Sequence, residues 1–208
     1  PSLLPSLLDA AAYNLARGAE GCALFESGSV YRAGLSDNGM AADEHHGLGA
    51  VIAGPAREPS WADPQPPAAR IETAHALVSS VLGALGVEWQ AEEGEVPFLH
   101  PGRTAMITTA DGPLGWFGEV HPAVAASWEI DQPIAALAID VGRAAAQAPA
   151  QTFFNDLTSF PPLREDLAVI VLADVSAARV VACITKAGSP LVSRAEVFDV
   201  YSGAQVGE

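Results

Sequence analysis

The chain has 208 residues, half of them hydrophobic, and its 25 acidic side chains outnumber its 10 basic ones to give a net charge of −15. This length fits one or two domains, and a field of this sign repels phosphate at long range, which argues against nonspecific binding to nucleic acids. No apolar run approaches the roughly 20 residues that a membrane span needs, and Cys22 and Cys183 are too far apart for a zinc pair. We therefore expect a cytoplasmic protein that does not bind membranes.

Two amphipathic helices are predicted in the first half of the chain. The first covers residues 3–17, where leucines and alanines recur at helical spacing and Gly18 follows in the position of a left-handed cap. The second covers residues 71–85 and stops at Gly86. Around them we expect a polar loop that ends at His46, a Pro-rich surface excursion over residues 54–67, and short strands at residues 22–26, 30–32 and 50–53.

Strands dominate the following part of the chain. Gly and Pro residues separate short candidates at residues 87–91, 103–109, 114–120 and 134–141. Together with the two helices, these strands predict an α+β fold in which helices flank an antiparallel sheet. The Ala-rich segment 144–151 is the expected boundary between a domain of residues 1–148 and a domain of residues 152–208. The second domain is predicted as a strand-helix-strand unit, at residues 166–172, 176–187 and 196–201.

Two runs contain residue types that bind phosphate or metal. The glycines of residues 47–54 suggest a phosphate loop, but such a loop opens a helix, whereas this run leads into strand-forming residues. Residues 43–46 read Asp-Glu-His-His, yet adjacent side chains in a loop rarely converge on one metal, so we interpret them as a solvated loop. The chain contains no Gly-Xxx-Ser-Xxx-Gly elbow and no Gly-Lys-Ser or Gly-Lys-Thr run, so hydrolase and P-loop functions are not supported.

Two histidines, His100 and His121, each precede a proline and lie near glycines. The proline disfavours the helical conformation for the residue before it, and glycine permits close approach of the backbone, so we interpret both histidines as parts of structural turns. Arg103 and Glu119 are either a buried pair across neighbouring strands or two charges at the rim of the fold.

Several motifs, taken in order along the chain, resemble the β subunit of bacterial phenylalanyl-tRNA synthetase. Four motifs resemble its catalytic-like module, namely Ser2 to Leu8, Leu24 to Tyr31, Phe98 to Ala105 and Gly115 to Pro122. Residues 159–172 and 196–203 resemble the first half of the ferredoxin-fold anticodon-binding domain that closes that subunit. The resemblance covers most of the chain.

The resemblance implies a class II synthetase-like fold without catalytic chemistry. Adenylate formation in that class needs arginines that clamp the ATP phosphates, and the strand predicted at residues 134–141 contains neither the expected glycines nor the arginine. We therefore assign no catalytic residue, cofactor or metal site to this chain. The family's β module packs against a catalytic α subunit in an assembly of two α and two β chains, and the complete enzyme makes phenylalanyl-tRNA from phenylalanine and tRNA(Phe), using ATP and Mg²⁺.

For the second domain the resemblance implies recognition of the anticodon stem and loop. The residues expected near an anticodon base are Leu163, Arg164, Asp199 and Tyr201. A carboxylate accepts hydrogen bonds from guanine N–H groups and a tyrosine ring stacks on a base, which is how single-stranded RNA is read. In the alternative interpretation Arg164 pairs with Asp166 on the surface and Tyr201 belongs to the core.

The chain also departs from the family pattern. Glu165 stands where the family usually has a second arginine, which weakens attraction for phosphate, and Ser27 replaces an aliphatic residue. Because the chain starts without Met and stops before the basic segment of the third ferredoxin strand, we expect an excised piece with a half-domain that is non-native, poorly ordered or completed by another chain. A rival interpretation is a small-molecule-binding regulatory module, since strand-helix-strand units also build such domains.

Overall fold

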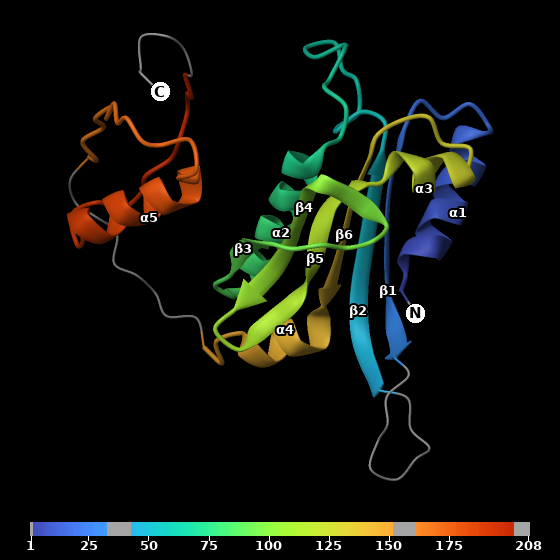
Figure 1. Ribbon diagram of the computed structural model, residues 1–208, viewed down its shortest axis with the longest axis horizontal. Helices are drawn as coiled ribbons and strands as arrows, with labels where there is room; N and C mark the ends of the chain where they lie inside the picture. The colour runs from blue at the N-terminus through green and yellow to red at the C-terminus, as the bar shows by residue number, and fades with distance from the viewer. Residues whose placement is uncertain (1, 33–42, 152–160, 202–208) are drawn as a thin grey trace. The chain divides into compact units, whose positions relative to one another are not determined.

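The computed structural model describes residues 2–32, 43–151 and 161–201. The chain forms two compact units, residues 1–153 and residues 154–208. The elements of the first unit, labelled in Figure 1, are α1 (Leu4–Leu15), β1 (Cys22–Arg32), β2 (Asp43–Ala53), α2 (Ile71–Leu85), β3 (Gln90–Glu93), β4 (Leu99–Thr109), β5 (Gly112–Val120), α3 (Pro122–Ser127), β6 (Ile134–Asp140) and α4 (Val141–Gln147).

An antiparallel sheet of six strands forms the middle of the first unit as far as it is described, in the order β1-β2-β6-β5-β4-β3. One face of the sheet packs against α2 and α4, and the other packs against α1 and α3. Figure 1 shows the strands lying between α1 and α2. This arrangement confirms the predicted α+β class with helices flanking an antiparallel sheet.

The two apolar cores follow from the side-chain periodicity of the elements. In α2 the buried residues recur every four positions, at Ala74, Val78 and Leu82, so one stripe of the helix faces the sheet. Neighbours along a strand face opposite cores, as Val51 and Ile52 do in β2. Full burial of a side chain such as Leu82 contributes about 1.5–3 kcal/mol relative to exposure.

Both predicted helices of the first unit are present with ends close to those expected. The α2 helix stops at Gly86, whose φ of 68° is left-handed and therefore favours glycine. At its start, the backbone N–H of Arg70 donates to Oγ1 of Thr73 at 3.3 Å. Gly18 follows α1 with a φ of 89°, in agreement with the predicted cap.

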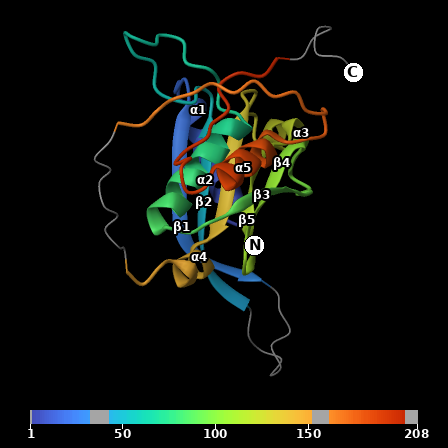
Figure 2. The same cartoon turned by 90° about the vertical axis from the view of Figure 1, so that its left-hand side faces the viewer.

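The predicted strands and loops at the start of the sheet are wrong in two respects. Residues 22–26 and 30–32 belong to one continuous strand, and residues 43–46 belong to its partner β2 rather than to a solvated loop. Every residue of β1 pairs with one of β2, and Gly28 lies opposite Gly47, so the long ladder outweighs the local turn preference of Ser-Gly-Ser. Figure 2 shows this hairpin extending beyond the other strands. Residues 33–42 lie outside the described residues.

Further along the chain, two short helices were not predicted. The first is α3, and the second is α4, which includes the first half of the segment 144–151 expected to be a domain boundary. Asp140 begins α4 because its Oδ1 accepts from the backbone N–H of Arg143 at 2.9 Å, and Ala144 is fully buried. Alanine is a strong helix former, so a cap and a packing surface are enough to make this segment helical.

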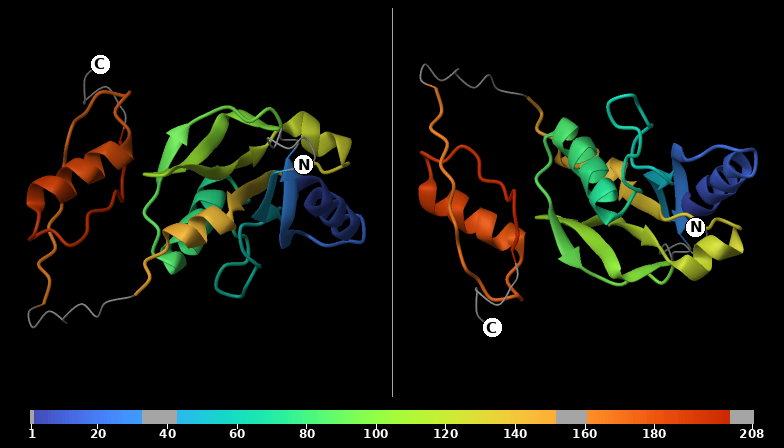
Figure 3. Two further views of the ribbon diagram at one scale, coloured as in Figure 1. Left: turned by 90° about the horizontal axis from the view of Figure 1, so that it is seen from below. Right: turned by 90° about the horizontal axis from the view of Figure 1, so that it is seen from above.

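The second unit contains α5 (Ala177–Gly188), which agrees with the predicted helix. Its cap is Ser176, whose Oγ accepts from the backbone N–H of Arg179 at 3.3 Å. The strands predicted at residues 166–172 and 196–201 are wrong for the described part of this unit, where both segments run without ladder partners. In a ferredoxin-like order these two segments are not neighbours, so neither supplies hydrogen bonds to the other. Figure 3 shows the extended segments beside α5.

Candidate functional site

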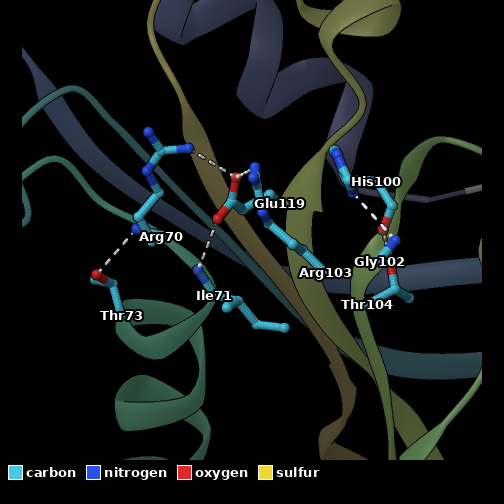
Figure 4. Close-up of polar contacts among 8 residues, drawn as sticks. All are labelled: Arg70, Ile71, Thr73, His100, Gly102, Arg103, Thr104 and Glu119. Atoms are coloured by element: carbon cyan, nitrogen blue, oxygen red, sulfur yellow. Dashed lines mark hydrogen bonds and ion pairs between the residues drawn. The ribbon is translucent and has the colours of Figure 1, made fainter. Parts of the chain in front are cut away.

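Glu119 is the one charged residue buried in the first unit's described part, with an exposed fraction of 4%. Its Oε2 atom accepts from Nη1 of Arg103 at 2.9 Å and from Nη1 of Arg70 at 3.2 Å (Figure 4). Its Oε1 atom accepts from the backbone N–H of Ile71 at 3.3 Å. A buried carboxylate needs such partners because desolvation of an unpaired charge costs several kcal/mol.

This carboxylate cluster, Glu119 with Arg70 and Arg103, joins three parts of the fold. Glu119 comes from β5, Arg103 from β4, and Arg70 from the residue before α2. The two arginine side chains are 46% and 45% exposed, so only the carboxylate is removed from water. The alternatives left open for Arg103 and Glu119 are therefore resolved as a pair with a buried acid and a half-exposed base.

The backbone of β4 is shaped to bring Arg103 to Glu119. The pairing of β4 with β5 shifts register between Leu99 and Thr104, which marks a bulge. A Cβ atom on Gly118 would lie 2.4 Å from the carbonyl oxygen of Arg103, so only glycine allows the two strands to approach this closely. The bulge therefore aims the arginine side chain at the carboxylate.

The two histidines of the predicted turns each accept a hydrogen bond from a backbone N–H two residues later in the chain. Nδ1 of His100 accepts from the backbone N–H of Gly102 at 3.1 Å, and the carbonyl of His100 accepts from Oγ1 of Thr104 at 2.7 Å (Figure 4). Nδ1 of His121 accepts from the backbone N–H of Ala123 at 3.1 Å and caps α3. These contacts agree with a structural role for both histidines, but His100 lies in the irregular part of strand β4 rather than in a turn.

Arg143 is a further arginine that sequence reasoning missed. It follows β6 by three residues and donates to the carbonyls of Pro113 at 2.7 Å and Asp111 at 3.0 Å. Arg70 was missed as well, although its position just before an apolar helix was the available signal. The guanidinium groups of Arg70, Arg103 and Arg143 are each engaged by oxygen atoms of the fold itself.

These residues do not fit a site for ATP and Mg²⁺. Clamping of phosphates needs guanidinium groups with uncompensated charge, whereas the charges of Arg70 and Arg103 are offset in part by the carboxylate that they share. Across residues 2–32, 43–151 and 161–201, no three His, Cys, Asp or Glu side chains are placed to hold a metal ion. No described helix is long and apolar enough to cross a membrane.

The four residues predicted to lie near an anticodon base are all on the surface of the second unit. Leu163 is 85% exposed and Tyr201 is 65% exposed, and Arg164 and Asp199 are exposed too. Within the described residues, no hydrogen bond joins any two of them, and Arg164 makes no ion pair with Asp166. Tyr201 is not a core residue.

Two family models match the chain in succession. Residues 1–141 match the phenylalanyl tRNA synthetase beta chain CLM domain. The chain belongs to the phenylalanyl-tRNA synthetase β-chain family. Residues 158–208 match the ferredoxin-fold anticodon binding domain. Both matches confirm the resemblance and favour it over a regulatory module.

Curated relatives of this family support the assignment over the whole chain. The phenylalanine–tRNA ligase beta subunit of Symbiobacterium thermophilum is 32% identical over 207 residues, which are 99% of this chain and 23% of that protein. The beta subunit of Moorella thermoacetica is 34% identical in an alignment of 214 positions that covers 100% of this chain and 26% of that protein. The chain thus spans about a quarter of the length of these relatives.

A solved structure supports the fold of this synthetase module. Pyrrolysyl-tRNA synthetase from Desulfitobacterium hafniense superimposes with a TM-score of 0.50 and 20% identity, over 69% of this chain and 47% of that one. At this identity the likeness concerns the fold alone, and it agrees with the predicted class II synthetase-like architecture.

Proposed function

We propose that this chain is the part of a phenylalanine–tRNA ligase β subunit that supports a catalytic α subunit and contributes to anticodon binding. Residues 1–148 form the catalytic-like module and residues 152–208 belong to the anticodon-binding domain. The assembly contains two α and two β chains and acts in the cytoplasm on phenylalanine and tRNA(Phe). The observation that carries the proposal is the match of the two domains, in this order, to one chain.

The carboxylate cluster supports a structural rather than a chemical role for the first domain. Its two arginines both form ion pairs with Glu119, and these contacts hold β4, β5 and the start of α2 to one another. ATP and Mg²⁺ are proposed to be used by the complete enzyme at a site in the α subunit. The module then supplies a rigid surface and no reacting group.

For the second domain we propose that Leu163, Arg164, Asp199 and Tyr201 contact the anticodon stem and loop. The match of residues 158–208 to an anticodon-binding domain supports this, and all four side chains are exposed, as contact with an RNA base requires. The net charge of −15 restricts the contact to a local one.

Co-purification with the α subunit of the same organism tests this function. The complete β protein, expressed with a tagged α subunit, should elute as one species with the mass of two α and two β chains. Separate elution of the two proteins at micromolar concentration would refute the supporting role.

A further inference from the structure

Trp61 is the most exposed large apolar residue described, with an exposed fraction of 97%. The other three tryptophans of the chain all have partners. Trp89 lies edge-on to Phe117, Trp116 lies edge-on to Phe98, and Trp128 donates its Nε1–H to Asp9 at 2.7 Å. Trp61 is therefore the one tryptophan of the four that is almost fully exposed, and its exposure needs a separate explanation.

The turn that carries Trp61 is closed by its own hydrogen bonds. The backbone N–H of Ser60 donates to the carbonyl of Asp63 at 2.9 Å, and the N–H of Asp63 donates back to the carbonyl of Ser60 at 3.1 Å. Nε of Arg57 donates to Oδ2 of Asp63 at 2.7 Å. These contacts fix the backbone on both sides of the indole, so part of the ordering cost of binding is met in advance.

The two ends of the same segment are joined to each other by backbone hydrogen bonds. The backbone N–H of Ala56 donates to the carbonyl of Pro67 at 2.8 Å, and the N–H of Ala69 donates to the carbonyl of Gly54 at 2.7 Å. The segment, here called the Trp61 arm (residues 54–69), is thus a closed projection between β2 and α2. In Figure 1 it stands out from the first unit beyond the ends of the strands.

We infer that the Trp61 arm is an interface anchor whose indole inserts into an apolar pocket of a partner protein. Resting on the function proposed above, that partner is the catalytic α subunit. Tryptophan is enriched among the few residues that dominate binding energy at protein interfaces, because it brings a large area at low entropic cost. A rigid turn that presents one such side chain is suited to this use.

The charges around Trp61 favour a protein over RNA as the occupant. Glu58 and Asp63 lie within three residues of the indole, and the one nearby cation, Arg57, is paired with Asp63. No uncompensated positive charge on the arm is available for a phosphate, and the chain as a whole carries −15. An apolar protein pocket meets no such repulsion.

Binding of the complete β protein to the α subunit, measured by titration, tests the inference. Trp61→Ala should weaken the complex about thirtyfold, which corresponds to a loss of about 2 kcal/mol. Trp61→Phe should retain most of the affinity, and Asp63→Asn should weaken it less than the alanine variant because it loosens the turn but keeps the indole. Gln65→Ala, an exposed change on the same arm, is the matched control and should bind like the native protein.

Two further readouts separate the possible outcomes. Tryptophan emission of the native protein should shift to shorter wavelength on adding α, and this shift should be absent in Trp61→Phe.

Native and Trp61→Ala proteins that bind α equally well would overturn the inference while leaving the proposed function intact. A native protein that fails to bind α would overturn both. Loss of tRNA affinity in Trp61→Ala with unchanged α binding would also overturn it, in favour of an RNA contact. The melting temperature of Trp61→Ala should equal that of the native protein, since the exposed ring packs against nothing.

Discussion

Nη1 of Arg103 on β4 lies 2.9 Å from Oε2 of Glu119 on β5, and the carboxylate at the centre of this contact is buried. The same oxygen also accepts from Arg70, so one acid connects the central sheet to the start of α2. Each arginine uses its Nη1 atom for this contact, and their positive charges are offset in part by the shared carboxylate. This contact therefore holds β4, β5 and the start of α2 to one another.

Removal of the buried acid should destabilise the first unit. Glu119→Ala leaves two guanidinium groups and the backbone N–H of Ile71 without their acceptor. We expect a loss of about 2–3 kcal/mol in the free energy of unfolding, at the low end for a buried ion pair because both arginines remain in contact with water. Urea denaturation followed by circular dichroism measures this loss.

The matched variants for that experiment are Arg103→Ala, Arg70→Ala and Glu92→Ala. Each arginine variant should cost less than Glu119→Ala, because the other arginine still pairs with the acid, and the double arginine variant should cost more than the sum of the two. Glu92 is exposed on β3, so its removal should change stability by less than about 0.5 kcal/mol. A Glu119→Ala protein as stable as Glu92→Ala would contradict the structural role of the cluster.

Substitution of one sheet glycine should have a large effect and substitution of another should have none. In Gly118→Ala the new methyl group would meet the carbonyl oxygen of Arg103, so β4 and β5 must separate, at a cost of at least about 2 kcal/mol. A methyl group added at Gly28, in β1, would meet no atom within 4 Å, so Gly28→Ala should be neutral or slightly stabilising. Thermal unfolding of both variants measures the difference, and equal midpoints would show that the close approach of β4 and β5 is not required.

The two cysteines should differ in reactivity. Burial raises the pKa of the Cys22 thiol above its ordinary value of 9.0, and the hydrogen bond with the backbone of Ala53 only partly offsets this. Less thiolate is then available at pH 8, so Cys183→Ser protein should react slowly with Ellman's reagent, and more quickly as the pH rises past 9. Cys22→Ser protein, which retains the exposed Cys183, should react faster at pH 8. The opposite order of rates would contradict the burial of Cys22.

The proposed RNA contacts predict two different kinds of loss in the complete enzyme. Tyr201→Ala should weaken tRNA(Phe) binding by roughly 1–3 kcal/mol through lost base stacking, at all salt concentrations. Arg164→Ala should weaken binding mainly at low salt and reduce the salt slope by about 1 if the guanidinium contacts a phosphate. Arg194 is paired with Glu196 in the same unit, so Arg194→Ala is the matched control and should leave affinity unchanged. Equal affinities for all three variants in a filter-binding assay would exclude these residues from the interface.

The sequence predicted those elements whose local signals and tertiary surroundings agree. The helices α1 and α2 have apolar stripes at helical spacing and glycines at their ends, and both were predicted nearly to the residue. The hairpin of β1 and β2 was misjudged at Ser27 to Ser29, because its pairing with residues 46–48 is a long-range interaction that no local pattern contains.

The same distinction applies to the site. The motifs around Arg103 and Glu119 were visible in the sequence, but whether the pair was buried depended on how closely β4 approaches β5, which Gly118 decides. Arg70 joined the cluster only through the placement of α2 against the sheet. The strands expected at residues 166–172 and 196–201 failed for a related reason, since a strand pattern is not sufficient without a neighbour to pair with.

The most direct test of a supporting, noncatalytic role is phenylalanine-dependent exchange of pyrophosphate into ATP, measured for the complete β protein alone, for α alone and for their mixture. We predict no exchange by the β protein alone and full exchange only when α is present. Exchange catalysed by the β protein in the absence of α would contradict the supporting role.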